Sequence, residues 1–295
     1  MLKSIPRKRN SDLITSCFLY ATALLTAVGL KYHYSQASGD ALGWILGPTA
    51  GVVEYTSGIR FEMEACVGYI NHEYGIIIAP ACAGVNFLII AFCMSAYSGF
   101  HQLRSSRLKF IWLGISFVCA YILTISVNAL RIIVSIHTII ANIQYPWITQ
   151  DRLHLIEGIL IYFITLYLFY LINEKMIHFC IGNGLRKKRN WRNKDNNYNR
   201  IIITTFIPFF WYALFTMGVP FLNQFFNKNS PLFIEYCLFI LSVCTVVFIF
   251  IFLIQLCLLG IWSKIGYNGK CRFIFGYLSN ILHRMNIQGH LKILK

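Results

Sequence analysis

Long apolar stretches separated by short polar segments run along most of the chain, and this pattern predicts helices that cross a membrane. A helix needs about 20 mostly apolar residues to span a hydrocarbon core of roughly 30 Å. Six stretches reach this length, near residues 13–31, 85–100, 110–139, 155–178, 201–222 and 232–262. The pattern therefore predicts an all-α polytopic membrane protein with about six transmembrane helices.

The composition agrees with this prediction. Of the 295 residues, 57% are apolar and 13% are charged, whereas an ordinary soluble domain carries roughly 25% charged residues.

The first apolar stretch follows four basic residues, as the core of a signal peptide does. No small-residue cleavage site closes it, because Leu30, Lys31 and Tyr32 follow directly. We therefore expect an uncleaved first helix.

Lysine and arginine gather in four segments, which predicts the orientation in the membrane. The N-terminus carries four of them, the 101–109 loop three, the 182–200 linker seven and the tail after residue 262 six. Short cytoplasmic loops carry such an excess, so we expect both termini in the cytoplasm and the acidic loops outside. The net charge of +15 then reflects topology and contact with anionic lipid, and we expect no nucleic acid partner.

Residues 41–57 are apolar enough to be a seventh span, but they hold three glycines, Pro48 and Glu54. If they crossed the membrane, the basic 101–109 loop and the basic linker would face outward, against the charge rule. We therefore predict an interfacial or re-entrant helix on the outer surface. The choice between six and seven spans rests on this segment.

A short β-hairpin is predicted next, just before a cysteine motif. Residues 59–65 alternate apolar and charged side chains, the period of a half-exposed strand, and residues 76–79 form a second strand candidate after a polar turn around 71–75. Pro80 and Gly84 then mark the change from strand to the second span. Cys82 lies between them, at a junction on the outer face.

The polar linker divides the chain into parts of different character. We expect a four-span core over residues 1–182, a basic cytoplasmic linker over 183–200, a two-span appendage over 201–262 and a basic cytoplasmic tail over 263–295. Few polar residues interrupt the appendage spans, which is typical of packing or lipid contact.

Arg131 lies inside the third span, where an arginine costs about 2.5–3.5 kcal/mol even on the lenient insertion scale. It needs a partner or a water-filled cavity. It also belongs to a polar stripe at helical spacing, which must face the interior of the bundle. Such a stripe can also join helices by hydrogen bonds alone. Its members are Thr124, Asn128, Arg131, Ser135 and Thr138.

His154 opens the fourth span on the predicted outer side, where a histidine can also be merely interfacial.

Most of the ten cysteines lie within spans, but Cys66 and Cys82 do not. A disulfide between these two is an alternative to a free Cys82 thiol. No His, Cys and carboxylate spacing suggests a metal, and no glycine-rich phosphate loop is present.

A thiol, an arginine and a histidine thus remain near one membrane surface. A thiolate attacks acyl carbons, an imidazole can take its proton, and a guanidinium can stabilise the oxyanion. Cys82, Arg131 and His154 are therefore the candidate catalytic residues, for cysteine acyl-transfer chemistry.

Three motifs in the same order resemble those of the exosortase and archaeosortase family, most closely its exosortase K type. They are the run 80–87 (PACAGVNF), the run 128–132 (NALRI), and His154 followed by Gly158. The approach to the first motif, from Trp44 through residues 47–50 to residues 75–79, is also similar, and the resemblance covers roughly residues 13–180.

The resemblance implies a multispanning cysteine transpeptidase in the cell membrane. Cys82 would be the nucleophile, His154 the acid and base, and Arg131 the stabiliser of the transition state or thiolate. Its substrates would be exported, membrane-anchored proteins that end in a short motif, a transmembrane helix and a basic cluster. The acyl-enzyme would pass to a lipid-linked or glycan acceptor, to an amine, or to water, without a cofactor.

Two alternatives remain at this point. The same thiol could serve a membrane acyltransferase or an intramembrane protease. The protein could also be a transporter or channel in which Arg131 and His154 line an anion pathway, as intramembrane charges often do.

Overall fold

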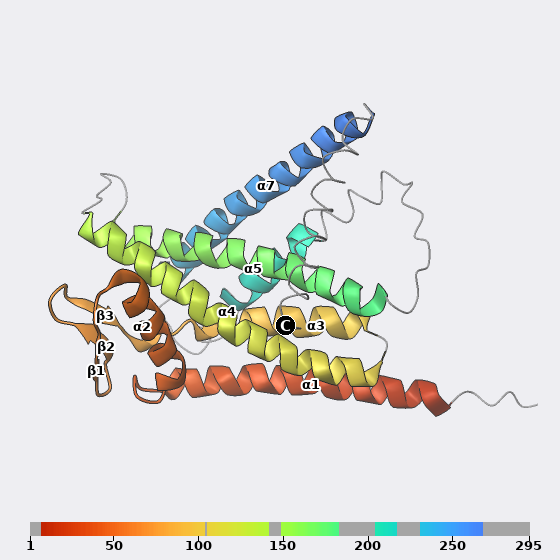
Figure 1. The fold of residues 1–295 in the computed structure, drawn as a ribbon, viewed down its shortest axis with the longest axis horizontal. Helices are drawn as coiled ribbons and strands as arrows, with labels where there is room; N and C mark the ends of the chain where they lie inside the picture. The colour runs from red at the N-terminus through yellow and green to blue at the C-terminus, as the bar shows by residue number, and fades with distance from the viewer. Residues whose placement is uncertain (1–6, 104, 142–148, 183–203, 217–230, 268–295) are drawn as a thin grey trace, which may run out of the picture. The chain divides into compact units, whose positions relative to one another are not determined.

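The computed structural model describes residues 7–103, 105–141, 149–182, 204–216 and 231–267, most of which are helical (Figure 1). Five helices are long, and a sixth, α2 (Gly43–Ser57), is short. Residues 204–216 are helical as well. The long helices are α1 (Arg7–Gln36), α3 (Val85–Gln102), α4 (Ser106–Ile140), α5 (Gln150–Gly182) and α7 (Pro231–Tyr267).

Five segments of the described residues are long and apolar enough to cross a membrane, which confirms an all-α polytopic membrane protein. They agree with five of the six spans predicted from the sequence, and they are Ile14–Gln36, Pro80–Gln102, Ser106–Ile139, Arg152–Cys180 and Cys237–Gln255. The remaining predicted span, 201–222, lies only partly within the described residues. A total of six therefore stays a prediction.

The chain divides into two compact units, Met1–Phe248 and Ile249–Lys295. In the second unit, described residues 249–267 continue helix α7. The predicted linker 183–200 and most of the predicted tail 263–295 lie outside the described residues. The domain boundaries drawn from the sequence thus stay predictions.

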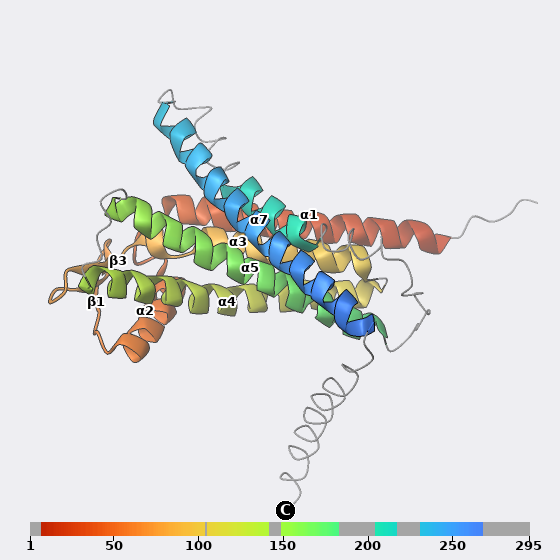
Figure 2. The ribbon, with the colours of Figure 1, turned by 90° about the horizontal axis from the view of Figure 1, so that it is seen from above.

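Helix α3 is the core of the first unit, since it packs against α1, α4 and α5. Figures 1 and 2 show these four helices side by side. Two thirds of the α3 span is buried, against 17–33% for the other candidate spans. A helix that is apolar on all sides is expected in the interior, and the run 87–94 is almost wholly inaccessible.

The outward faces of α1, α4 and α5 carry large apolar side chains. On α1, Leu19, Ala23 and Ala27 are buried at helical spacing, while Leu25 on the opposite side is 70% exposed. An exposed apolar surface of this extent would favour association in water but suits a lipid environment. The same pattern appears at Ile111, Val118 and Ile122 of α4 and at Leu168 and Ile172 of α5.

Helix α2 has 15 residues and is therefore about 22 Å long, shorter than a hydrocarbon core of about 30 Å. It packs against α4, where the Trp44 ring stacks on Tyr121 at 5.9 Å between centroids. The Tyr121 hydroxyl also donates a hydrogen bond to the Trp44 carbonyl at 2.6 Å. Its length favours the predicted position on or within one membrane surface.

A three-stranded antiparallel sheet precedes Cys82, in the order β1 (Glu62–Glu64), β2 (Gly68–Asn71) and β3 (Ile76–Ile78). The two predicted strands correspond to β1 and β3, and the polar turn after Asn71 is also present. Strand β2, which pairs with both, was not predicted from the sequence. The chain reverses between β1 and β2 because Cys66 (φ 64°) and Gly68 (φ 124°) adopt positive φ angles.

Candidate active site

Cys82 ends a short 3₁₀-helix, η1 (Pro80–Cys82), that joins strand β3 to α3. The backbone N–H of Cys82 donates to the Ala79 carbonyl at 2.8 Å, and Gly84 turns the chain into α3 with a φ of 70°. A Cβ atom at Gly84 would lie 3.2 Å from the side chains of Thr124 and Asn128. The position therefore needs glycine for its backbone angle and for the close approach of α4.

Asn128 ties the cysteine loop to the helices. It is fully buried, and its amide Nδ2 donates a hydrogen bond to the Cys82 carbonyl. Its Oδ1 accepts from the Tyr162 hydroxyl of α5 at 2.8 Å. The Tyr162 ring in turn stacks on Phe87 of α3 at 4.8 Å. Asn128 thus holds the backbone of Cys82, and Tyr162, stacked on Phe87, holds Asn128.

Arg131 lies at the centre of the site. Its Nη1 donates to the Tyr162 hydroxyl at 3.3 Å, its Nη2 donates to Nε2 of His154 at 2.9 Å, and its guanidinium lies 5.4 Å from the Tyr162 ring centre. Arg131 therefore contacts His154 directly, and hydrogen bonds through Tyr162 and Asn128 link it to the Cys82 carbonyl.

Gly158 leaves room for this arginine. A Cβ atom at Gly158 would lie 3.0 Å from Nε of Arg131, a tighter approach than side chains normally make. In α5, Gly158 follows His154 by one turn of helix. The histidine and the glycine of the third sequence motif thus both contact Arg131.

The arginine contact determines the tautomer of His154. A guanidinium can only donate hydrogen bonds, so Nε2 of His154 accepts and Nδ1 carries the proton. Nδ1 then donates to Oγ of Ser135 at 2.6 Å. The Ser135 hydroxyl can donate onward to Glu157 at 3.3 Å, and Thr138 donates to the same carboxylate at 2.9 Å.

The polar stripe on α4 therefore faces the interior of the bundle, as its spacing predicted. Four of its five members contact Cys82, His154 or Glu157. Thr124 is buried beneath Gly84. The sequence pattern missed Tyr162 and Glu157, and Tyr162 lies in an apolar run where nothing distinguishes it from the other tyrosines.

A second cation lies at the end of α1. Lys31 Nζ donates to Oδ1 of Asn86 at 2.9 Å, and Asn86 belongs to the first turn of α3. Lys31 also lies 5.1 Å from the ring centre of Tyr34. Helix α1 is thus bound to the start of α3, which follows the cysteine loop.

Polar residues at the opposite end of the bundle set the depth of the site. Gln102 donates to Glu174 at 2.5 Å, and Lys109 donates to Ser16 at 2.8 Å. Cys82 is 20 positions from Gln102, Arg131 is 22 from Lys109, and His154 is 20 from Glu174. At about 1.5 Å per residue these distances are about 30 Å, the thickness of a hydrocarbon core. The three residues thus lie at a similar height along the bundle, about one hydrocarbon thickness from the polar contacts at its other end.

Cys66 and Cys82 are both free thiols in the structure. The backbone N–H of Cys66 donates to Oδ2 of Asp40 at 3.1 Å, which fixes Cys66 beside the loop between α1 and α2. The alternative disulfide is therefore not formed in this structure. Within the described part of the chain, no group of three or more His, Cys, Asp or Glu side chains is arranged to hold a metal ion.

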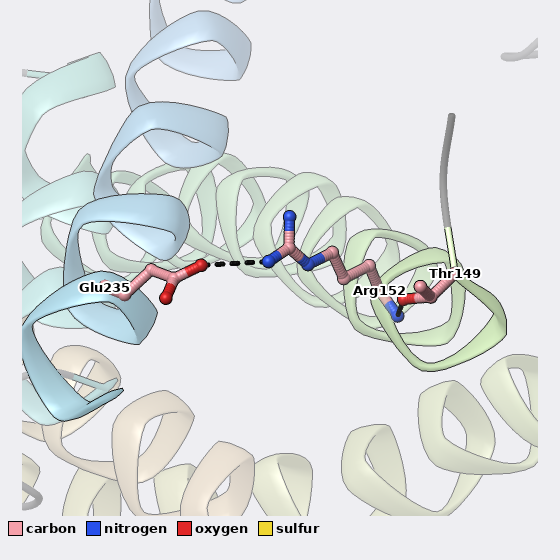
Figure 3. A network of polar contacts seen from close by, with 3 residues as sticks. All are labelled: Thr149, Arg152 and Glu235. Atoms are coloured by element: carbon pink, nitrogen blue, oxygen red, sulfur yellow. Dashed lines mark hydrogen bonds and ion pairs between the residues drawn. The ribbon is translucent and has the colours of Figure 1, made fainter. Parts of the chain in front are cut away.

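The start of α5, next to His154, also contacts α7. Figure 3 shows Arg152 donating from Nη2 to Oε1 of Glu235 at 2.9 Å, while its backbone N–H reaches the Thr149 hydroxyl. The guanidinium lies 5.8 Å from the Phe239 ring centre. Both charged side chains are more than half exposed, so in water such a pair would contribute at most about 1 kcal/mol.

Comparison with models of known protein families identifies the family of this chain. Residues 16–171 match the model of the transmembrane exosortases. The chain belongs to this family. The matched segment contains Cys82, Arg131 and His154, and it runs from α1 into α5. Searches of the curated proteins and of the solved structures gave no match.

Membership makes the chain a membrane protein of a protease and transpeptidase family that processes sorting signals. The resemblance noted in the sequence is thereby confirmed at the level of the family. The exosortase K type stays a prediction, because the match extends only to the family.

Proposed function

We propose that this exosortase is a cysteine transpeptidase that cleaves C-terminal sorting signals of exported proteins through a thioester at Cys82. The observation that carries the proposal is the position of Arg131, which hydrogen-bonds His154 and is linked to the Cys82 carbonyl through Tyr162 and Asn128. A thiol, an imidazole and a guanidinium in this relation can perform acyl transfer.

In the first half-reaction, the Arg131 N–H leaves Nε2 of His154, and Nε2 takes the proton of the Cys82 thiol. The thiolate attacks the carbonyl carbon of the scissile peptide bond. The oxyanion that forms is stabilised by the Arg131 guanidinium. When the C–N bond breaks, the leaving amine takes the proton from His154. The products are a thioester on Cys82 and a released C-terminal fragment that contains the membrane helix.

In the second half-reaction, His154 removes a proton from the acceptor, and the acceptor attacks the thioester carbonyl. The C–S bond breaks, and the Cys82 thiolate takes back the proton. An amine, or a lipid-linked or glycan acceptor, gives a transferred product, and water gives a hydrolysed one. The mechanism needs no cofactor, because every proton moves between Cys82, His154 and the substrates.

The substrates we propose are membrane-anchored proteins with a C-terminal motif, a transmembrane helix and a basic cluster. The depth of the site supports this class, since Cys82, Arg131 and His154 lie about one hydrocarbon thickness from the polar contacts at the other end of the bundle. A peptide bond just outside a substrate helix would meet the thiol at that depth.

We further propose that the protein lies in the cell membrane with both termini in the cytoplasm and the site on the outer face. The loop charges support this orientation. A reporter that is active only in the cytoplasm should give signal when fused after Arg107 and none when fused after Gly75. The reverse result would mean that residues 41–57 cross the membrane.

The thioester can be detected directly. A reporter protein carrying a tripartite C-terminus from the same genome should form a covalent adduct with the purified full-length enzyme. Mass spectrometry should place the adduct on Cys82, and hydroxylamine should release it, as expected for a thioester. Cleavage that proceeds without any adduct, and that survives alkylation of Cys82, would contradict the proposed function.

A further inference from the structure

Glu157 is a carboxylate within a candidate span, Arg152–Cys180, where an acidic residue is costly. It lies three residues after His154, and therefore near the same side of α5. Both of its oxygens accept hydrogen bonds from hydroxyl groups of α4: Oε1 from Thr138 at 2.9 Å and Oε2 from Ser135 at 3.3 Å. The carboxylate is thus held in one orientation by two groups from the neighbouring helix.

Ser135 joins this carboxylate to His154. Since Arg131 occupies Nε2, the protonated Nδ1 of His154 donates to the Ser135 oxygen, at 2.6 Å. The hydroxyl proton of Ser135 is then available for Glu157. The hydrogen bonds therefore run in one direction, from Arg131 to His154, then Ser135, then Glu157.

The charges along this series of hydrogen bonds indicate its role. When His154 accepts the thiol proton it becomes a cation next to the Arg131 guanidinium, and two like charges in contact disfavour each other. None of the ion pairs among the described residues involves Arg131. Glu157 is the anion that its hydrogen-bond chain reaches, and it can offset the second positive charge.

We propose that Glu157, acting through Ser135, is a positioning and charge-balancing residue that enables His154 to accept the proton of Cys82. This inference rests on the proposed function, because it assigns His154 the role of base. The relay of Glu157 and Ser135 holds the imidazole through Nδ1 and stabilises its protonated form, in which Nε2 no longer accepts from Arg131. The proton moves from the Cys82 sulfur to Nε2 as the Arg131 N–H leaves that nitrogen, and the hydrogen bonds of Ser135 and Glu157 stay intact.

The relay can be tested without a physiological substrate, by the rate at which iodoacetamide alkylates Cys82. The thiolate is the reactive form, so the rate at pH 7 reports how well His154 takes the proton. In the full-length protein, followed by mass spectrometry of the Cys82 peptide, Glu157→Gln and Ser135→Ala should each slow alkylation about tenfold. The double variant should be no slower than either single one, because the two residues act as a unit.

Two further variants separate the relay from simple helix packing. Ser135→Thr keeps the hydroxyl and should react within about twofold of the wild type. Ser116→Ala is the matched control, since Ser116 is a buried α4 hydroxyl bonded to Ser95 of α3 at 2.9 Å. It lies 19 residues from Ser135, or about 28 Å along the helix, and its loss should leave the rate unchanged.

Wild-type alkylation in Glu157→Gln, or an equal slowing in Ser116→Ala, would overturn the relay. Rejection of the relay can be distinguished from rejection of the proposed function. If processing requires Cys82 while Glu157→Gln reacts at the wild-type rate, the relay is wrong and the transpeptidase proposal stands. If processing persists without Cys82 but alkylation follows the expected pattern, the transpeptidase proposal is wrong and the relay of Glu157 and Ser135 stands.

Discussion

Replacing Cys82 by alanine should abolish processing of a membrane protein that carries the tripartite C-terminus, by at least about 10³-fold, because no other group at the site can form the acyl-enzyme. The variant should still reach the membrane. The loop around residue 82 is held by its backbone, through the Asn128 amide and the Ala79 carbonyl. Loss of one half-buried sulfur atom leaves both hydrogen bonds in place. Release of the C-terminal fragment, followed by immunoblot in cells, measures the effect.

Cys66→Ser is the matched control for this experiment. Cys66 is a free thiol outside the candidate spans, and it is bound to Asp40 rather than to the site. Its replacement should leave processing within about twofold of the wild type. A large loss in Cys66→Ser would instead favour the alternative in which Cys66 and Cys82 form a disulfide in the cell.

The same variants separate the proposed function from its rivals. A transporter or channel would not depend on the thiol, so full activity in Cys82→Ala would favour a pathway lined by Arg131 and His154. A membrane acyltransferase would depend on Cys82 but would leave the substrate chain uncut. Mass spectrometry of the released fragment distinguishes a transpeptidase from an acyltransferase, because only cleavage gives a new terminus next to the substrate helix.

The helices and the polar stripe could be predicted from the sequence because both follow from local periodicity. An uninterrupted apolar run of about 20 residues has few alternatives to a span. The positions 124, 128, 131, 135 and 138 lie on one helix face whatever the tertiary structure is. That the stripe should face inward followed from the cost of Arg131 in lipid, and its contacts with α5 agree with this.

Strand β2 and the hydrogen-bond partners of the site could not be predicted in the same way. Strand β2 has only four residues, and it exists because Cys66 and Gly68 reverse the chain at positive φ, which a pattern of apolar residues does not reveal. Tyr162 and Glu157 acquire their roles from the way α4 and α5 pack together. Only the cost of a carboxylate in a span could have drawn attention to Glu157.

Replacing Arg131 by alanine should lower processing by about 10²- to 10³-fold, the range measured when one oxyanion donor is removed from a preorganised site. The reduction should appear in the rate of the chemical step, because the guanidinium contacts His154 and is linked to the Cys82 carbonyl through Tyr162 and Asn128. Membrane insertion should be unaffected or improved, since an arginine in a span costs about 2.5–3.5 kcal/mol. Arg131→Lys keeps the charge but cannot reach Tyr162 and His154 together in the planar geometry of a guanidinium. We expect it to recover little of the lost rate.

Gly158→Ala tests the position of Arg131 without removing its charge. An alanine normally stabilises a helix relative to glycine by roughly 0.5–1 kcal/mol, but here the added methyl group would lie 3.0 Å from Nε of Arg131. The guanidinium must shift, and its contact with His154 at 2.9 Å should lengthen. We expect processing to fall about tenfold, since the guanidinium must give by a few tenths of an ångström and a misplacement of about 1 Å can cost 10²-fold. Gly114→Ala in α4 is the matched control, because a Cβ there meets nothing within 4 Å. Equal activity in the two alanine variants would show that the close approach of Arg131 to Gly158 does not determine the rate.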